Sequence, residues 1–348
     1  MRYNQVYLED IAWVAPQNVI STRALEMKLK PALDALGIPV GHLEALTGLK
    51  ERRFWDPGMK PSVPGTEASR ILLGRNADLS SKIGALVNGS VCRDYLEPAT
   101  ATVLAHELGL PQNTVLFDVS NACLGFATAM SVVANMIELN QVEAALVVSS
   151  EGSLEVVENT ISNLLSNPSE KALLAAVPTL TLGSAAVAML MVNKRLSKKK
   201  LQFVGGVSLN DARQSQLCIW GPDTGFPSSI QHTMATDGKT LLETGTVLAA
   251  KTWDKFSLET GFDKKSAHAY FCHQVGPIHT SMVFKTLGLD ASKDYSSYEV
   301  HGNTGSAALP LTLGMGIEAD AIQPGQKAVL MGIGSGLVCT MYALEWHV

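Results

Sequence analysis

The sequence predicts an α/β protein made of two fused halves, each rich in strand–helix–strand units. Short apolar runs typical of buried strands alternate with longer segments whose apolar residues recur at helical spacing. A basic run, Lys198-Lys199-Lys200, interrupts this alternation, which then begins again. With 348 residues, of which 46% are hydrophobic and 17% charged, the chain is long enough to bury a large core. We therefore expect one half over residues 1–196 and a second over residues 197–348.

The first half is expected to contain strands wherever a short apolar run is bounded by polar or turn-forming residues. These runs are Val6–Val14, Ile83–Ser90, Thr114–Ser120, Glu143–Ser150 and Ala185–Val192. Its expected helices show a 3.6-residue apolar period. They are Thr22–Leu36, Pro98–Leu108 with proline at its first position, and Cys123–Leu139, whose many small residues predict a buried helix.

The second half repeats the alternation. Its expected strands are Leu201–Leu209, Ala267–His273, Ala328–Ile333 and Val338–Trp346, and its expected helices are Leu241–Phe256, Pro277–Leu287 and Ala307–Ile317. Three insertions rich in Pro, Gly and polar residues interrupt the two halves, namely Asp56–Thr66, Leu154–Leu180 and Asn210–Gly238. Loops of this length commonly act as lids or binding elements, so we expect the substrate entrance there.

Composition and charge exclude several classes of function. The net charge is -5 and the sequence has no basic stripe beyond its central run, which argues against nucleic acid as a partner. Five cysteines at irregular spacing do not predict a disulfide framework, and without a CxxC pair they do not predict a zinc site. A reducing, cytoplasmic setting follows. No apolar run of about 18 residues and no secretory apolar segment is present, so we expect no membrane insertion.

Cys123 is the most informative residue. It stands in Asp118-Val119-Ser120-Asn121-Ala122-Cys123-Leu124-Gly125, where an apolar strand meets the first turn of a small-residue helix. The unpaired N–H groups and the dipole of a helix N-terminus favour a thiolate, so this position suits a nucleophile. Two partners follow downstream, His273 and Asn303, each where an apolar strand gives way to a loop. The order Cys, His, Asn fits two different kinds of cysteine enzyme.

One of these is the papain-like hydrolase, in which His follows Cys by about 130–150 residues. The gap between Cys123 and His273 is 150 residues, yet the surrounding Cys-Gly-Ser-Cys-Trp segment is absent. Structural alternatives exist for each candidate. His273 alone would fit a satisfied buried histidine, and Asn303 alone would fit a left-handed turn. Cys92, Cys218, Cys272 and Cys339 are expected to be inert core residues.

The chain resembles the thiolase superfamily of condensing enzymes, specifically the ketoacyl-ACP synthase III group. Thr47-Gly48-Leu49-Lys50-Glu51-Arg52-Arg53 is similar to the early signature of that group, and Asn121-Ala122-Cys123, His273-Gln274 and Gly302-Asn303-Thr304 fall in the expected halves. Within the group the chain most resembles the OleA-type enzymes, which join two long-chain acyl thioesters head to head. That sharper resemblance depends on Cys92-Arg93-Asp94-Tyr95-Leu96-Glu97-Pro98, on Glu299 to Asn303 and on Gly332-Ile333-Gly334-Ser335-Gly336-Leu337.

This resemblance implies the five-layered α-β-α-β-α thiolase fold with duplicated halves, a homodimer and a place in fatty acid and olefin biosynthesis. It implies an acyltransferase that forms an acyl-Cys123 intermediate and carries out a Claisen condensation to a β-keto acid or thioester. His273 and Asn303 would donate hydrogen bonds to the oxyanion of the second thioester, and the backbone N–H groups of Cys123 and Gly336 would serve the acyl-cysteine carbonyl. Arg52 and Arg53 fall in the region that binds coenzyme A phosphates. Acyl-CoA is the implied substrate, and no cofactor or metal is implied.

Glu97 distinguishes the two functions that the resemblance leaves open, namely condensation with and without decarboxylation. A decarboxylating synthase obtains its carbanion from malonyl-ACP and needs no carboxylate base, whereas a condensation without decarboxylation must remove an α-proton. In OleA-type enzymes a glutamate at this position, reaching in from the other subunit, is the proposed base. The alternative is a glutamate placed for the dipole of the following helix. We expect the non-decarboxylating reaction, with condensation of acyl-CoA and malonyl-ACP as the alternative, and a non-catalytic thiolase-fold subunit as disfavoured because Cys, His and Asn are all present.

Overall fold

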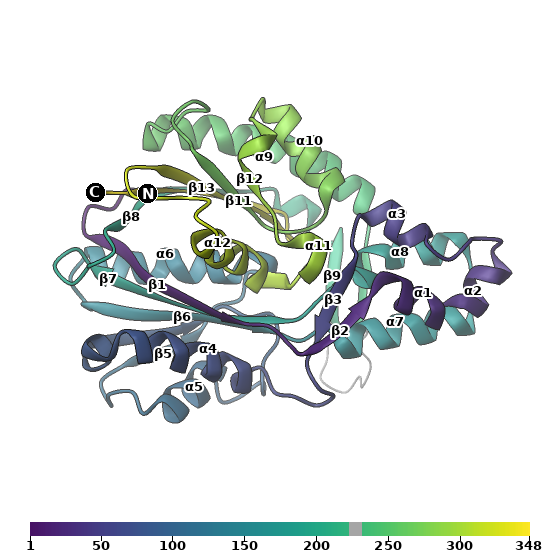
Figure 1. The fold of residues 1–348 in the computed structure, drawn as a ribbon, viewed down its shortest axis with the longest axis horizontal. Coiled ribbons are helices and arrows are strands. Elements are labelled where there is room, and N and C mark those ends of the chain that lie inside the picture. Colours follow the sequence, from purple (N-terminus) through teal and green to yellow (C-terminus); the bar gives the residue numbers. More distant parts are fainter. Residues whose placement is uncertain (223–231) are drawn as a thin grey trace.

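The computed structural model describes residues 1–222 and 232–348, and its strands form one hydrogen-bonded sheet of ten strands and two sheets of two strands (Figure 1). The strand order is β12-β11-β13-β14-β8-β1-β7-β6-β4-β5. In chain order these strands are β1 Val6–Val14, β4 Ile83–Asn88, β5 Val115–Asp118, β6 Ala144–Glu151, β7 Ala185–Asn193, β8 Leu201–Asn210, β11 Ala269–Cys272, β12 Asp294–Tyr295, β13 Lys327–Gly334 and β14 Val338–Trp346. Strands β1 and β8 pair only through Tyr7 with Gln202 and Leu8 with Leu201, so the sheet divides there.

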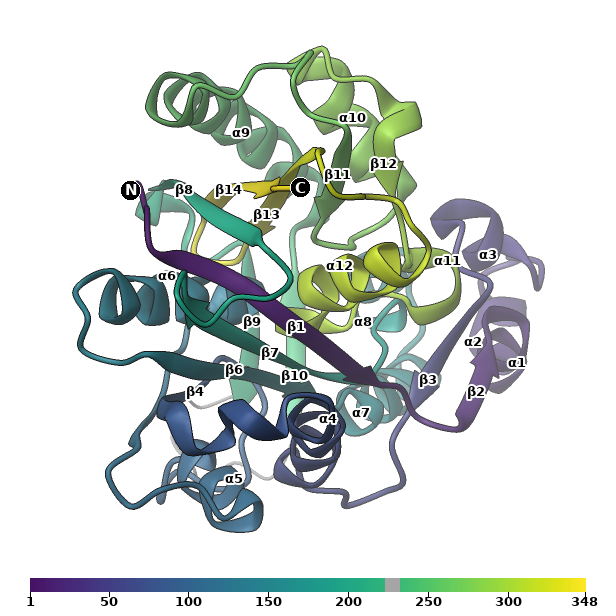
Figure 2. The ribbon, with the colours of Figure 1, turned by 60° about the vertical axis from the view of Figure 1, so that its left-hand side comes forward.

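The two parts of the sheet lie in separate layers with helices between and outside them (Figure 2). The central layer holds α6 Gly125–Glu138 and α12 Ala308–Glu318. The outer helices α4 Ser62–Arg75 and α5 Thr100–Leu108 cover the part built from the first half, and α9 Gly238–Thr260 and α10 Pro277–Leu287 cover the other. This is the five-layered α-β-α-β-α arrangement that the resemblance implied, and the predicted fold class is confirmed.

The helix that follows Cys123 is buried between the two sheet parts. Phe126, Ala129 and Val133 of α6 are fully buried and belong to the central core cluster. Each fully buried Val or Phe side chain stabilises the fold by about 1.5–3 kcal/mol, so a helix held on both faces cannot shift without large cost. The start of α6 is therefore a fixed platform for the residue that precedes it.

A lateral group of helices and two small antiparallel strand pairs packs beside the layered core (Figure 1). It consists of α1 Thr22–Lys28, α2 Lys30–Ala35, α3 His42–Thr47, α7 Leu154–Ser166, α8 Glu170–Leu180 and the strand pairs β2 Asn18–Ser21 with β3 Glu51–Phe54 and β9 Cys218–Pro222 with β10 His232–Thr236. Its own core includes Leu25, Leu33, Val157 and Ile161. The short helix α11 Tyr298–His301 connects this group to the second half.

Several sequence predictions are corrected in this lateral group. The insertion Leu154–Leu180, expected to be a loop, forms the two helices α7 and α8, because its Val and Ile residues make a buried stripe. The predicted helix Thr22–Leu36 is two helices that meet at Leu29. Pro31 lies in the first turn of α2, where it has no N–H to continue the hydrogen bonds of α1.

Two further boundaries differ from the predicted ones. The helix expected to begin at Pro98 begins at Thr100, because the Asp118 carboxylate accepts the N–H groups of Thr100 and Ala101 at 2.9 Å each. Helix α4 begins inside the insertion Asp56–Thr66 and continues past it. The insertion Asn210–Gly238 carries the β9–β10 pair, and residues 223–231 of this insertion lie outside the described residues. Among the helices described, none is both long enough and apolar enough to cross a bilayer.

Candidate active site

Cys123 lies in a tight turn between β5 and α6. The turn is the 3₁₀ segment Ala122–Leu124, so Cys123 precedes α6 by two residues and is not in its first turn as predicted. Ala122 has a φ of 46°, a left-handed conformation that non-glycine residues rarely adopt and that is concentrated at functional sites. At Gly125 a Cβ atom would lie 2.0 Å from the carbonyl oxygen of Gly89, so only glycine lets the two loops pack. The turn is therefore tightly constrained.

The thiol of Cys123 is protonated in the free protein at neutral pH. Burial of its sulfur raises the pKa of Cys123 to about 12, and the charges of Cys218 and Glu151 act in the same direction. The N–H groups of Cys123 itself and of Ser335 lower this pKa, by less. The expectation that the helix N-terminus produces a thiolate is thus corrected, because desolvation outweighs the backbone donors. The loop donor at the sulfur is Ser335, and its neighbour Gly336 has a left-handed φ of 118°.

His273 is brought next to the Cys123 turn by β13. It follows β11 directly, and its N–H donates to the Met331 carbonyl at 2.8 Å. A Cβ atom at Gly332 would lie 3.7 Å from Cβ of His273, and one at Gly334 would lie 3.6 Å from Cβ of Cys123. Glycines on β13 therefore leave the space in which both residues meet.

Burial keeps the imidazole of His273 neutral. It lowers the pKa of His273 to about 4, and His279 contributes in the same direction. The Nδ1 atom is buried and has no hydrogen-bond partner among the described residues. A neutral imidazole carries one N–H donor and one acceptor nitrogen. The ring can therefore donate to a carbonyl oxygen of a ligand without carrying a charge.

The backbone around Asn303 fixes its amide. Its N–H donates to the Thr181 carbonyl at 3.0 Å, and its carbonyl accepts the N–H of Gly183 at 2.9 Å. Its side-chain Oδ1 accepts the N–H of Gly305 at 3.0 Å, which leaves the Nδ2 group as a donor for a ligand. The left-handed conformations fall on Gly302 and Gly305. The alternative that Asn303 itself supplies a left-handed turn is wrong.

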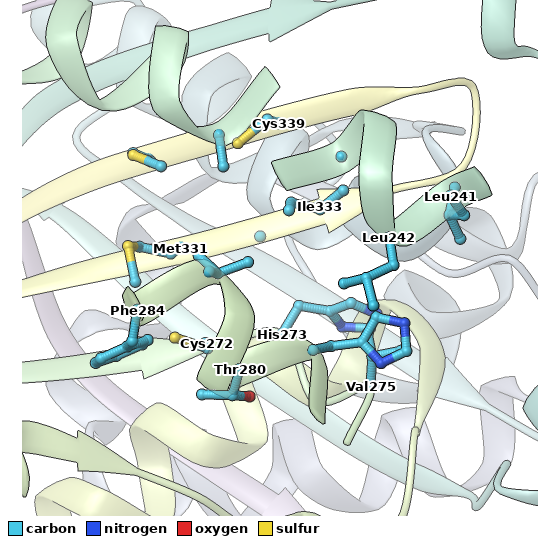
Figure 3. A pocket seen from close by; sticks show the side chains of 16 residues that line it. Leu241, Leu242, Cys272, His273, Val275, Thr280, Phe284, Met331, Ile333 and Cys339 are labelled. Carbon is cyan, nitrogen blue, oxygen red and sulfur yellow. The ribbon is translucent and has the colours of Figure 1, made fainter. Parts of the chain in front are cut away.

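An apolar cavity adjoins His273 (Figure 3). It lies between α9, α10, β13 and β14 and is partly open to solvent. Its lining side chains are mainly aliphatic, aromatic or sulfur-containing, among them Leu242, Val283, Phe284, Met331 and Ile333. The only imidazoles in the lining are those of His273 and His279. A cavity of this composition suits an aliphatic chain whose polar end lies beside His273.

Glu97 lies on an exposed loop. The loop joins β4 to α5, and its neighbours Tyr95 and Leu96 are 46% and 79% exposed. No hydrogen bond joins Glu97 to Cys123, His273 or Asn303 among the described residues. In the single chain, Cys123 and His273 both adjoin the glycines of β13, the segment Gly305–Ala307 that follows Asn303 contacts the Cys123 turn, and Glu97 lies on the surface.

The two candidate CoA-binding arginines differ in exposure. Arg52 is 1% exposed, and its guanidinium donates to the carbonyl oxygens of Leu180 at 3.0 Å and Ile20 at 3.5 Å. Burial lowers the pKa of Arg52 to about 10. A group so enclosed cannot reach a phosphate, so the expectation for Arg52 is corrected. Arg53 is half-buried and lies 3.5 Å from the Glu51 carboxylate.

One buried acid at the site was missed by the sequence reasoning. Glu151 ends β6, is 2% exposed, and its charge contributes to the environment of Cys123. The available signal was a lone acidic residue closing the apolar run Ala144-Ala145-Leu146-Val147-Val148-Ser149-Ser150. Such a residue in a fully buried strand requires hydrogen-bond partners.

Comparison with known proteins identifies the class. Residues 117–204 match the family described as 3-oxoacyl-[acyl-carrier-protein (ACP)] synthase III, and residues 258–346 match its C-terminal family. Over 99% of its length the chain is 35% identical to the acyl-CoA:acyl-CoA alkyltransferase of Shewanella oneidensis and 33% identical to that of Xanthomonas campestris pv. campestris, and each relative is covered completely.

Solved structures agree with this result. The structure of cerulenin-bound Xanthomonas campestris OleA has a TM-score of 0.93 at 32% identity, with 99% of this chain and 98% of that chain covered. A structure described as 3-oxoacyl-(acyl carrier protein) synthase III from Xanthomonas oryzae pv. oryzae has a TM-score of 0.92 at 33% identity, with 99% and 100% covered.

The fold and the site thus define a thiolase-fold condensing enzyme, an acyltransferase. The chain belongs to the ketoacyl-ACP synthase III-like family, in its branch of OleA-type acyl-CoA:acyl-CoA alkyltransferases. The papain-like alternative is wrong, because that class does not share this fold.

Proposed function

We propose that this enzyme joins two fatty acyl-CoA molecules head to head through an acyl-Cys123 intermediate. The observation that carries the proposal is the apolar cavity lined in part by His273, together with the β13 glycines that adjoin both His273 and Cys123. It offers an apolar surface for an aliphatic chain next to His273. Two full-length relatives, 35% and 33% identical to the chain, are named as acyl-CoA:acyl-CoA alkyltransferases, which supports acyl-CoA as both substrates.

In the first step the sulfur of Cys123 forms a bond to the thioester carbonyl carbon and the bond to the CoA sulfur breaks. The proton of the thiol passes to the departing CoA thiolate, so the exchange of one thioester for another is nearly balanced in energy. The N–H groups of Cys123 and Gly336 would donate to the oxyanion of this step. Because burial raises the pKa of Cys123, the thiol loses its proton during acyl transfer and not before the substrate binds.

In the second step a base removes an α-proton from the second acyl-CoA, and the carbanion attacks the acyl-Cys123 carbonyl. The new carbon–carbon bond forms as the bond to sulfur breaks, and the proton taken by the base returns to the thiolate. Neutral His273 and the Nδ2 group of Asn303 are suited to donate to the developing oxyanion, because neither needs to lose a charge or a competing partner. Glu97 is our proposed base.

A homodimer would place Glu97 at the site. Strand β5 ends the sheet, its outer edge pairs with no other strand of the described residues, and Val115 on it is 45% exposed. Unpaired edges with exposed apolar residues favour pairing with another strand. The exposed Tyr95 and Leu96 lie on the Glu97 loop. We propose that this face joins two subunits and carries Glu97 into the partner's site.

Further parts of the proposal concern partners, location and organisation. We retain Arg53 as a candidate for binding the phosphates of coenzyme A.

The five cysteines are all free thiols, which is consistent with a reducing cytoplasm. We propose residues 1–196 and 197–348 as the two halves, since the chain passes from β7 to β8 between them. Elongation with malonyl-ACP is the second candidate function, favoured by the synthase III relative from Xanthomonas oryzae.

Covalent acylation tests the proposed intermediate. Incubation with a long-chain acyl-CoA should add the mass of one acyl group to the peptide that carries Cys123, measured by mass spectrometry. Cys123→Ala should lose this mass while it still binds CoA. Acylation that maps to Cys92 or Cys272 would contradict the assignment.

A further inference from the structure

The carboxylate of Glu151 is surrounded by donors from two separate loops. From the loop after β4, the N–H of Val91 donates to Oε1 at 2.8 Å and the N–H of Cys92 donates to Oε2 at 3.0 Å. From the segment after Asn303, the N–H of Ser306 donates to Oε1 at 3.2 Å, and the Ser306 hydroxyl donates to the same oxygen. Burial raises the pKa of Glu151, and the hydrogen bonds from Ser306, Val91 and Cys92 oppose this rise. Because an ionised carboxylate accepts hydrogen bonds and donates none, these donors favour the anion.

Both loops lead to residues of the proposed mechanism. Cys92 lies five residues before Glu97, and Ser306 lies three residues after Asn303. Gly305 has a φ of 59°, and a Cβ atom there would lie 3.2 Å from Cδ of Glu151. The N–H of this same Gly305 holds Oδ1 of Asn303. Contacts therefore run continuously from Glu151 to the amide of Asn303.

Neighbouring groups complete the surroundings of Glu151. Ser149 and Ser306 share a hydrogen bond of 2.6 Å between their hydroxyls, which holds Ser306 from the β6 side. The titratable groups around the carboxylate are the thiols of Cys92 and Cys123, and Glu155 acts on Cys92. Cys123 is also influenced by Cys218. A negative charge at Glu151 opposes a second negative charge on the Cys123 sulfur.

We propose that Glu151 is a positioning residue whose carboxylate fixes the Asn303 segment and the loop leading to Glu97 relative to Cys123. The inference rests on the proposed function. It assigns two measurable effects to one buried carboxylate. A purely structural residue would change neither the charge felt by Cys123 nor the balance between acylation and condensation.

The test compares Glu151→Gln with Glu151→Asp. In Glu151→Gln the charge is lost and the amide nitrogen faces the N–H of Cys92, so the loop contact is lost as well. We expect iodoacetamide to alkylate Cys123 faster at pH 8, by about threefold for each unit by which the thiol pKa falls, because the thiolate fraction rises more than its nucleophilicity declines. We expect kcat for condensation to fall by about 10²-fold, the effect of a displacement near 1 Å, with little change in KM.

The Glu151→Asp variant separates the effect of the negative charge from the effect of side-chain length. Glu151→Asp keeps the charge, so the alkylation rate of Cys123 should equal that of the parent, while condensation falls because the shorter side chain cannot contact both loops. Glu9→Gln is the matched control, since Glu9 is a buried carboxylate that accepts the N–H groups of Lys198 and Lys199 away from the site. It should leave both rates at the parent values.

Mass spectrometry of the peptide that carries Cys123 separates its alkylation from that of Cys92. Parent rates of alkylation and condensation in Glu151→Gln would overturn the inference. If Glu151→Gln does not fold, the Ser306→Ala variant tests the inference instead, because it removes the hydroxyl that donates to Glu151 and keeps the carboxylate of Glu151. It should slow condensation and leave acylation unchanged, and a parent condensation rate there would also overturn the inference. A parent enzyme that does not acylate Cys123 would instead refute the proposed function.

Discussion

The buried, neutral state of His273 makes a quantitative prediction about acid stability. Its side chain is 6% exposed, and burial lowers its pKa from 6.5 to about 4. Between about pH 6.5 and pH 4 the unfolded chain therefore binds a proton that the folded chain does not. The free energy of unfolding must fall as the pH falls through this window. At pH 5 the loss attributable to His273 is about 2 kcal/mol relative to pH 8.

The substitution His273→Asn removes this titration and keeps a polar side chain of smaller volume. Urea unfolding at pH 8 and pH 5 should show that the parent loses about 2 kcal/mol more than the variant between these two values. Asp294, whose pKa burial raises to about 6, changes stability in the opposite direction, and the comparison with the parent cancels its contribution.

His301 supplies the matched control. It is also buried, its pKa is lowered to about 4 by burial with a further contribution from Arg53, and it has no place in the proposed mechanism. His301→Asn should flatten the pH dependence of stability by a similar amount and retain condensation, whereas His273→Asn should lose condensation. If His273→Asn leaves the pH dependence of the parent unchanged, the argument that His273 is a neutral donor is refuted.

Three further predictions concern the other proposed residues. Asn303→Ala should slow condensation by about 10²–10³-fold, the effect of losing one oxyanion donor, and should slow acylation of Cys123 far less, so equal losses in a single-turnover assay would contradict its role. Glu97→Gln should retain acylation while condensation of two acyl-CoA molecules falls by about 10²–10⁴-fold, and a parent rate would make Glu97 structural. Mixed dimers of Cys123→Ala and Glu97→Ala subunits should regain up to one working site each, and verified heterodimers without activity would place the base within its own subunit.

The layered core and the positions of Cys123 and His273 could be predicted from sequence because their signals are local. Each of these two residues follows an apolar strand, and the return to a polar loop marks the edge of a sheet. The strand expected before Asn303 is wrong, because Asn303 follows the short helix α11 and Gly302. The position of the Cys123 turn before α6 could not be predicted exactly. It depends on a left-handed Ala122 and on the contact between Gly125 and Gly89, which are tertiary features.

Three other features could not be predicted, because the residue types involved do not reveal whether their side chains are buried. Leu154–Leu180 contains many polar residues, yet its apolar residues lie on one face that meets α1 and α2. Arg52 appears in sequence as a candidate surface charge, but strand alternation in β3 turns it inward. Glu151 closes an apolar strand and carries no motif. Its proposed role depends on hydrogen bonds from Val91 and Ser306, which are tertiary contacts that the sequence does not reveal.

Product analysis with one acyl-CoA as the only substrate tests the central claim most directly. A single long-chain acyl-CoA, with neither malonyl-CoA nor malonyl-ACP present, should yield a β-keto product that contains both acyl chains. One free CoA is released for each carbon–carbon bond if the product remains a thioester, and two if it is hydrolysed to the β-keto acid. Mass spectrometry of the product and a thiol assay for CoA measure both quantities. Carbon–carbon bond formation that occurs only after malonyl-ACP is added, with release of CO₂, would contradict the account and assign the enzyme to the elongating synthases.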